Sequence, residues 1–283
     1  MIGSGPAPVE LAGMSLAGPV LVAAGCGGTG PELAPYLPDE GLAVLGGFVT
    51  RSITLNPRAG DHRPLVVETP SGLLHAAGLP SPGLEPFLAT ELPWLARSGT
   101  RVVVSITGST LGEHVELARR LGRAPGLSAI EVPVSGEPFH AASLVSAVAR
   151  DLPRGVPVLA KIRPDLLRVV ETARAVLDAG AGAVVVGDAL PAALPDGRPA
   201  GLSGPAIRPV ALRCVTEVRA ALPDAPVVGG GGIMTADDAR SFLAAGAVAV
   251  QVGTALLHDP TTAAHLAAEL ASTRPAPQED TAP

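Results

Sequence analysis

Two glycine-rich segments near the end of the chain could hold a phosphate group. The first, VVGGGGIMTADDA, places glycines 229–232 between an expected strand and a helix whose expected N-cap is Thr235. Without a Cβ, backbone amides approach an anion closely, and a helix N-terminus adds the positive end of its dipole. The second, QVGTALLHDP, offers amides at Gly253 and a hydroxyl at Thr254. Together they predict a phosphate site, although glycines that serve only tight turns would leave the same pattern.

A single lysine is the other residue that points to chemistry. Of 20 basic residues only Lys161 is a lysine, and it lies near the end of the apolar segment VPVLAKI. A compact ammonium at that place can stabilise negative charge that develops on a bound cofactor or substrate. The alternative is a lysine whose ammonium merely reaches out to water from the end of the strand.

The elements that must position these residues are eight short β-branched runs, which alternate with Ala- and Leu-rich helical stretches. Eight such strands with intervening helices predict an α/β protein with the (β/α)8 TIM-barrel fold, and a doubly wound open sheet is the alternative. Two long connections, 51–82 and 188–205, leave from the face where barrel enzymes build their active sites. The eight runs are 20–24, 43–50, 101–106, 129–134, 156–162, 183–187, 226–230 and 248–253.

Composition excludes several classes of protein. The chain has 283 residues, a net charge of −6 and no basic block, so it lacks the electrostatic footprint of a nucleic-acid binder. No apolar run approaches the ~18 residues of a membrane span, and no secretory signal begins the chain, so we expect a cytoplasmic protein. Its two cysteines give neither a disulfide framework nor metal-ligand spacing. We expect one barrel domain over residues 1–271 and a disordered tail over 272–283.

Three long segments resemble the dihydroorotate dehydrogenase family, most closely its class 1 catalytic subunits. They are VTRSITLNPRAGDHRPLVVETPSGLLHAAGLPSPG, AGLSGPAIRPVALR and VVGGGGIMTADDARSFLAAGAVAVQVGTALL. The resemblance implies an FMN-dependent barrel that moves a hydride between a substrate carbon and flavin N5. It also implies a homodimer or a separate electron-transfer partner, because family members work as homodimers or with an iron–sulfur flavoprotein subunit.

The resemblance also assigns residues to the FMN site. Lys161 would lie at the N1/O2 edge of the flavin, where it stabilises the reduced anionic ring. Arg51 stands where the family usually has lysine, and Ser105 where it has asparagine. Besides Lys161, the residues expected to hold FMN are Ala24, Gly25, Ser52 and Ser105 around the ring, and Gly204, Gly231, Gly232, Gly253 and Thr254 at the phosphate.

The substrate half differs from the family pattern. Family members carry a loop N-x-S-C-P-N, or serine for cysteine, whose Cys or Ser is the catalytic base, whereas PVSGEP puts Gly136 at that position. Each buried polar group left without a partner costs about 1–3 kcal/mol. We therefore expect a small cyclic or unsaturated substrate other than dihydroorotate. The family's ring-binding asparagines match His75, Pro133, Pro138 and Asp188.

Several side chains could replace the missing base. His75 is the first candidate, since an unperturbed imidazole titrates near pH 6.5, and an exposed loop histidine is the alternative. Ser135 neighbours the lost position but needs a partner to activate it. Cys26 and His140 are weaker candidates. Asp188 would be an acid or would bind a cationic group, and a helix-capping or loop role is the alternative. We expect Arg51, His75 and Asp188 to contact the substrate.

The resulting hypothesis is an FMN-dependent oxidoreductase that acts on CH–CH or C=C bonds. Three alternatives stay open: a genuine dihydroorotate dehydrogenase with a rebuilt pocket, a degenerate paralogue that keeps FMN as a structural ligand, and a flavin-free enzyme that acts on a phosphorylated metabolite.

Overall fold

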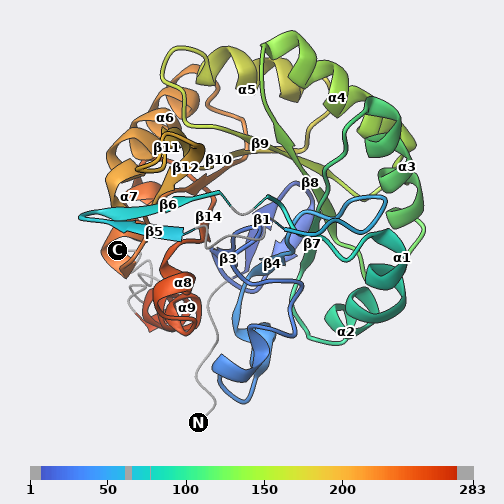
Figure 1. Ribbon diagram of the computed structural model, residues 1–283, viewed down its shortest axis with the longest axis horizontal. Coiled ribbons are helices and arrows are strands. Elements are labelled where there is room, and N and C mark those ends of the chain that lie inside the picture. Colours follow the sequence, from blue (N-terminus) through green and yellow to red (C-terminus); the bar gives the residue numbers. More distant parts are fainter. Residues whose placement is uncertain (1–7, 61–65, 77, 273–283) are drawn as a thin grey trace, which may run out of the picture.

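Eight parallel strands close into a barrel (Figure 1). The computed structural model describes residues 8–60, 66–76 and 78–272. Each barrel strand lies within one of the expected runs, so the TIM-barrel prediction is confirmed and the open sheet is excluded. Around the barrel the strands follow the order β10-β13-β14-β3-β4-β7-β8-β9. Their bounds are β3 (Val20–Val22), β4 (Gly47–Val49), β7 (Val102–Ser105), β8 (Ala129–Val134), β9 (Val158–Ile162), β10 (Ala183–Val186), β13 (Val227–Gly230) and β14 (Ala249–Val252).

Helices form a ring outside the barrel (Figure 1). They cover the outward-facing valines and isoleucines of the strands in one continuous apolar layer. Short 3-10 or π-helical turns precede α6 and join α1 to α2. The α-helices are α1 (Leu84–Pro86), α2 (Leu92–Ala96), α3 (Leu111–Leu121), α4 (Pro138–Asp151), α5 (Val169–Asp178), α6 (Arg208–Ala221), α7 (Ala236–Ala244), α8 (Ala255–His258) and α9 (Thr262–Ser272).

Side chains inside the barrel form a second, smaller apolar layer. Leu159 of β9 belongs to this inner layer, while its neighbours Ala160 and Ile162 pack outward against the helices. This is the alternation of a strand, whose successive side chains point to opposite faces. A short hairpin, β1 (Val9–Leu11) with β2 (Met14–Leu16), packs on the inner layer. The inner layer is therefore apolar at one end of the barrel, which leaves the other end for polar chemistry.

The two long connections do not form separate loops. The connection after β4 contains β5 (Val66–Thr69) and β6 (Gly72–His75), and the one after β10 contains β11 (Leu190–Ala193) and β12 (Pro199–Ser203). These four strands make one antiparallel sheet in the order β11-β12-β6-β5. The junction is tight, because a Cβ on Gly72 would lie 2.1 Å from the Ser203 carbonyl oxygen. Segments far apart in sequence are thus joined at the barrel mouth.

The ends of the chain limit what can be compared with expectation. The expected tail, 272–283, lies outside the described residues except for Ser272, which ends α9. Within the ranges that the structure describes, no helix is both long and apolar enough to cross a membrane.

Candidate active site

Lys161 lies inside the barrel in a closed polar network. Its Nζ donates to Gln251 Oε1 at 3.0 Å and to Glu131 Oε1 at 3.4 Å. Gln251 Nε2 in turn donates to Glu131 Oε2 at 2.7 Å. The Lys161 side chain is 10% exposed and that of Glu131 is fully buried, so the alternative of a lysine that reaches out to water is wrong.

The network leaves one donor of Lys161 available. A lysine ammonium has three N–H donors, and Glu131 and Gln251 accept from two of them. A buried ion pair is stable only when its remaining polar atoms are satisfied, and Gln251 provides this by bonding to both partners. The structure therefore holds a fixed positive charge below the barrel mouth, with a donor to spare for a bound group.

Backbone atoms form a cradle at the ends of β12, β13 and β14. Gly204 and Gly232 both have positive φ, at 93° and 70°. A Cβ on Gly232 would lie 2.6 Å from the Gly204 carbonyl oxygen, and one on Gly204 would lie 3.5 Å from Cγ2 of Thr254. The structure thus brings three predicted phosphate residues together. Gly231, with φ 116°, packs instead against Ile207 and Ala211.

The N-terminus of α7 is already occupied by a side chain. Thr235 is its N-cap, as predicted, and forms a capping box with Asp238. Asp238 Oδ2 accepts from the backbone amides of Met234 and Thr235, both at 3.0 Å. The same carboxylate pairs with Arg208, whose Nη1 reaches the Gly232 carbonyl at 3.3 Å. The capacity to bind an anion therefore belongs to the glycines rather than to the first turn of α7.

The predicted ring-binding residues line the ends of β3, β4 and β7. Ser52 Oγ and Ser105 Oγ are 2.9 Å apart. Ala24 and Gly25 follow β3, beside Cys26, and a Cβ on Gly253 would lie 3.4 Å from the Cys26 sulfur. Burial raises the pKa of the Cys26 thiol, and the Lys161 charge only partly opposes this. Cys26 is therefore a protonated thiol, which disfavours it as a base. The other cysteine, Cys214, is buried in α6.

His75 ends β6 in the sheet above the barrel. It pairs with Gly201 of β12, and a Cβ on Gly201 would lie 3.1 Å from Nε2 of the imidazole. Burial lowers the pKa of His75, while the nearby Asp188 carboxylate opposes the shift. The half-buried imidazole is therefore neutral at neutral pH and able to accept a proton, which argues against the alternative of a freely exposed loop histidine.

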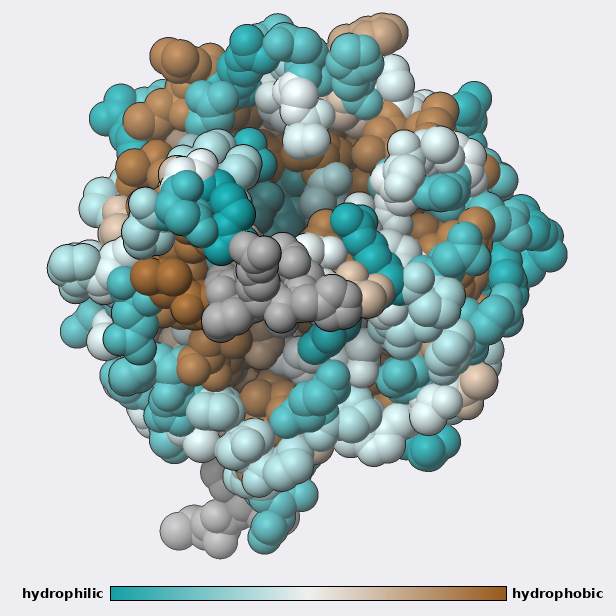
Figure 2. Space-filling view, viewed as in Figure 1, coloured by the Kyte–Doolittle hydropathy of each residue, from teal (hydrophilic) through white to brown (hydrophobic). Residues whose placement is uncertain are grey.

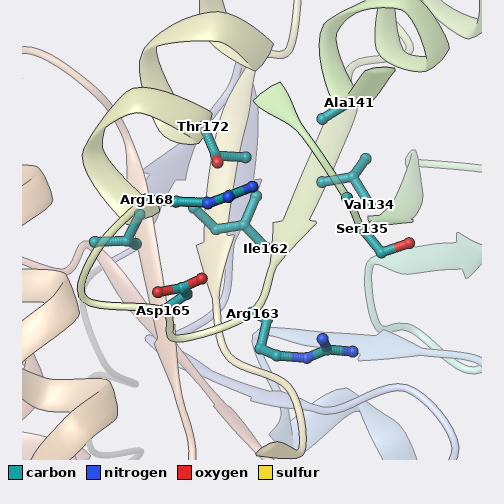
Figure 3. Close-up of a pocket in the computed structure, with 10 residues that line it drawn as sticks. Val134, Ser135, Ala141, Ile162, Arg163, Asp165, Arg168 and Thr172 are labelled. Carbon is teal, nitrogen blue, oxygen red and sulfur yellow. The ribbon is translucent and has the colours of Figure 1, made fainter. Parts of the chain in front are cut away.

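The loop after β8 is open where the family carries its base. Gly136 has φ 85°, and no atom lies within 4 Å of where its Cβ would be. Ser135 is exposed, and within the described part of the chain its hydroxyl has no hydrogen-bond partner. His140, also exposed, lies in the first turn of α4 with its ring against Phe139. A hollow opens between this loop and the one after β9 (Figure 3). Figure 2 shows the same face hollowed beside β9, with hydrophilic residues inside.

Sequence reasoning missed three charged or polar residues of this site. Glu131 and Gln251 interrupt the apolar strands AIEVPV and AVQV, and a lone polar residue in a buried strand was the signal that could have found them. Arg163 was missed because it follows its strand. It lies two residues after Lys161, is exposed, and lines the hollow.

A parallel barrel with a glycine cradle and a buried lysine at the same mouth defines a class of barrel enzyme that binds a phosphorylated ligand beside a fixed positive charge. Comparison with known proteins identifies the family. The dihydroorotate dehydrogenase family profile matches residues 7–273. The chain belongs to this family, and the predicted enzyme class, an FMN-dependent oxidoreductase acting on a CH–CH bond, is confirmed.

Curated relatives agree over nearly the whole chain. Three of them carry the name "Dihydroorotate dehydrogenase B (NAD(+)), catalytic subunit". The relative from Desulforudis audaxviator is 43% identical over 281 residues, covering 93% of this chain and 90% of the relative. That from Anoxybacillus flavithermus is 39% identical, with 93% and 89% covered. That from Geotalea uraniireducens is 41% identical over 280 residues, with 92% and 90% covered.

These relatives correct one expectation. The prediction of a substrate other than dihydroorotate is wrong, because relatives at about 40% identity over nearly the full length are dihydroorotate dehydrogenases. The prediction counted the amide groups lost at His75, Pro133, Pro138 and Asp188. It gave too little weight to the Arg51 guanidinium, the His75 imidazole and the Ser135 hydroxyl, which can satisfy a polar ring in other ways.

Proposed function

We propose that this chain is the catalytic subunit of a dihydroorotate dehydrogenase that oxidises dihydroorotate to orotate with FMN. The observation that carries the proposal is the Lys161 network next to the glycine cradle, because it joins a fixed charge to an anion site at one barrel mouth. The names of the relatives support the choice of substrate.

The residues present fit FMN. Gly204 and Gly232 admit no Cβ, because one would lie 2.8 Å from Gly72 Cα and 2.6 Å from the Gly204 carbonyl oxygen, so no side chain covers their backbone amides, as a phosphate requires. Thr254 would add a hydroxyl donor. Lys161 would supply positive charge and its spare donor to the edge of the flavin ring. When bound, FMN accepts the hydride that leaves the substrate carbon. The remaining residues that we assign to the cofactor are Gly231 and Gly253 at the phosphate, and Ala24, Gly25, Ser52 and Ser105 along the ring.

Oxidation of dihydroorotate also releases a proton from the neighbouring ring carbon, and a base must accept it. We assign this role to His75, because burial keeps its imidazole neutral and Asp188 stabilises the charge that forms on protonation. Ser135 is the alternative, but no described side chain bonds to its hydroxyl to activate it.

Arg51 contributes positive charge on the other side of the mouth. Its Nη2 lies 3.6 Å from Glu32 Oε1, and its buried Nε has no partner in the part of the chain that the structure describes. An unsatisfied buried donor favours a ligand that accepts from it. We assign Arg51, with His75 and Asp188, to the substrate.

The relatives' names also suggest how electrons leave. A catalytic subunit of an NAD-linked enzyme needs a separate subunit that passes electrons to NAD+. We propose such an electron-transfer partner, a homodimeric catalytic unit and a cytoplasmic location. Gel filtration of the purified chain tests the dimer.

Anaerobic titration tests the function itself. The protein purified with added FMN should be yellow, and dihydroorotate should bleach the flavin band while orotate accumulates. Buffer without dihydroorotate is the control. A colourless protein would contradict FMN binding, and a yellow protein that dihydroorotate leaves oxidised would contradict the substrate.

A further inference from the structure

Glu131 places a negative charge inside the barrel, just below its mouth. It lies two residues beyond Ala129 on β8, and Ala129 belongs to the apolar inner layer, so strand alternation points Glu131 inward at the next level. Lys161 on β9 and Gln251 on β14 occupy the same level, because each also follows an inner-layer residue by two positions. The three side chains therefore form one polar layer between the apolar interior and the mouth.

The carboxylate of Glu131 opposes the charge of Lys161. Glu131 is fully buried, and its Oε1 lies 3.4 Å from the Lys161 ammonium. In the part of the chain that the structure describes, no second cation pairs with Glu131, so the two residues together carry no net charge. Away from water, a third group beside them responds to the difference between two opposed charges. A ligand at the mouth would thus meet a weaker positive potential than Lys161 alone would give.

The choice of a carboxylate at position 131 is not explained by holding Lys161 in place. Taking a carboxylate out of water costs free energy, and a buried ion pair is weak evidence for stability. A glutamine at this position has the same shape, and its amide oxygen could accept from the same ammonium. What only the carboxylate adds is negative charge, so the structure indicates an electrostatic role for Glu131.

The proposed reaction requires a flavin that also gives its electrons up. Dihydroorotate loses a hydride to FMN and a proton to the base, and the reduced flavin then passes two electrons to the NAD+-linked partner and releases one proton. Positive charge beside the anionic reduced ring stabilises it relative to the oxidised ring and raises its reduction potential. An unopposed Lys161 would therefore favour the first half of the cycle and hinder the second.

We propose that Glu131 lowers the reduction potential of the bound flavin by opposing the charge of Lys161, and so allows the reduced cofactor to pass its electrons on. Gln251 is the positioning residue of the pair. Its Nε2 donates to Glu131 Oε2 at 2.7 Å, which turns its Oε1 toward Lys161 and fixes both charged groups. The proposal rests on the proposed function, because it takes FMN as the group at the mouth.

The reduction potential of the holoenzyme tests the proposal. It is measured by slow chemical reduction beside an indicator dye, without dihydroorotate. Glu131→Gln keeps the shape and removes the charge. It should raise the ratio of reduced to oxidised flavin at a fixed dye potential about tenfold to a hundredfold, as a unit charge a few ångströms away would. Each tenfold step corresponds to about 30 mV for two electrons.

Two further variants separate charge from shape and from a general effect of mutation. Glu131→Asp keeps the charge but shortens the side chain, and its ratio should stay close to that of the unaltered enzyme. Glu116→Gln is the matched control, because it removes a partly exposed carboxylate that pairs with Arg119 on α3, in the outer ring of helices. It should not change the ratio.

A ratio in Glu131→Gln that equals or falls below that of the unaltered enzyme would overturn the proposal, as would a Glu131→Asp variant that behaves like Glu131→Gln. If Glu131→Gln does not fold with FMN, the double variant Lys161→Met with Glu131→Gln decides, because it buries no unpaired charge. Its potential should lie near that of the unaltered enzyme, and a much lower one would overturn the proposal.

Failure of the proposed function would look different. A holoenzyme that shows these shifts but that dihydroorotate does not bleach would contradict the proposed substrate and support the role of Glu131. A purified protein that binds no FMN would contradict both.

Discussion

The two halves of the barrel mouth are built from different material. On the side of β12, β13 and β14, backbone atoms of glycines make the site, and a single added Cβ on Gly232 would collide with the Gly204 carbonyl. On the side of β6, β8 and β9, the site consists of side chains on loops, and Gly136 has empty space around it. A site made of backbone tolerates almost no substitution, whereas one made of side chains can exchange its groups one at a time.

The largest effect on stability and rate should come from removing the charge of Lys161, which lies between the two halves of the mouth. Lys161→Met removes the positive charge and leaves Glu131 buried without its partner, which costs about 3–5 kcal/mol of unfolding free energy. Loss of such a charge from an active site also lowers kcat by about 10²–10³. Chemical denaturation and flavin reduction by dihydroorotate measure the two effects. Adding Glu131→Gln should restore much of the stability but not the rate. A rapid Lys161→Met enzyme would contradict the role of the charge.

A pair of glycine variants tests the half of the mouth that is built from backbone, on the side of β12, β13 and β14. Gly232→Ala adds a methyl group against the Gly204 carbonyl and should release FMN, measured by fluorescence of free flavin. Gly155→Ala is the matched control, because Gly155 also has a positive φ, 92°, but open space around its Cβ. The control should lose about 1–2 kcal/mol of stability from backbone strain alone and keep FMN. Equal FMN loss in both variants would refute the cradle.

His75, in the half of the mouth that is built from side chains, predicts a pH dependence of catalysis. Because burial lowers the pKa of His75, kcat/KM should rise with pH through an apparent pKa below 6.5 and stay level through neutrality. His75→Asn should lower the rate by a factor of about 10²–10⁴ and should remove this rise of kcat/KM with pH. The unfolded chain binds the proton more tightly, so the contribution of His75 to stability is present above pH 6.5 and is lost as the pH falls through the lowered pKa. An unchanged pH profile in His75→Asn would mean that a residue other than His75 is the base.

The smallest effect should come from restoring a hydroxyl at the vacant base position. Gly136→Ser has space for its side chain but adopts a left-handed backbone, so it should cost about 1–2 kcal/mol of unfolding free energy. If His75 is the base, kcat should change by less than threefold. A large gain in rate would mean that the loop after β8, rather than β6, still controls proton removal.

Sequence alone predicted the barrel well, because its strands are short apolar runs. Segments with helical periodicity, which end at glycines, separate these runs. It also located the glycine cradle and Lys161, whose types are unusual at those positions. It could not place Glu131 and Gln251 around Lys161, since that contact joins three strands distant in sequence. It also misjudged the substrate at Pro133 and Pro138, because residues lost from one loop do not show which polar groups the other loops bring to the same site.

The ladder between β6 and β12 has a consequence for folding and for access to the site. It joins chain segments separated by several barrel strands, so its closure must wait until those strands are in place. We expect this sheet to form last during folding and to open first in the native state, ahead of any barrel strand. Since both long connections are held by the same ladder, they would be released together. The exchange of substrate for product would then be a single cooperative opening, and its frequency would set an upper limit on turnover.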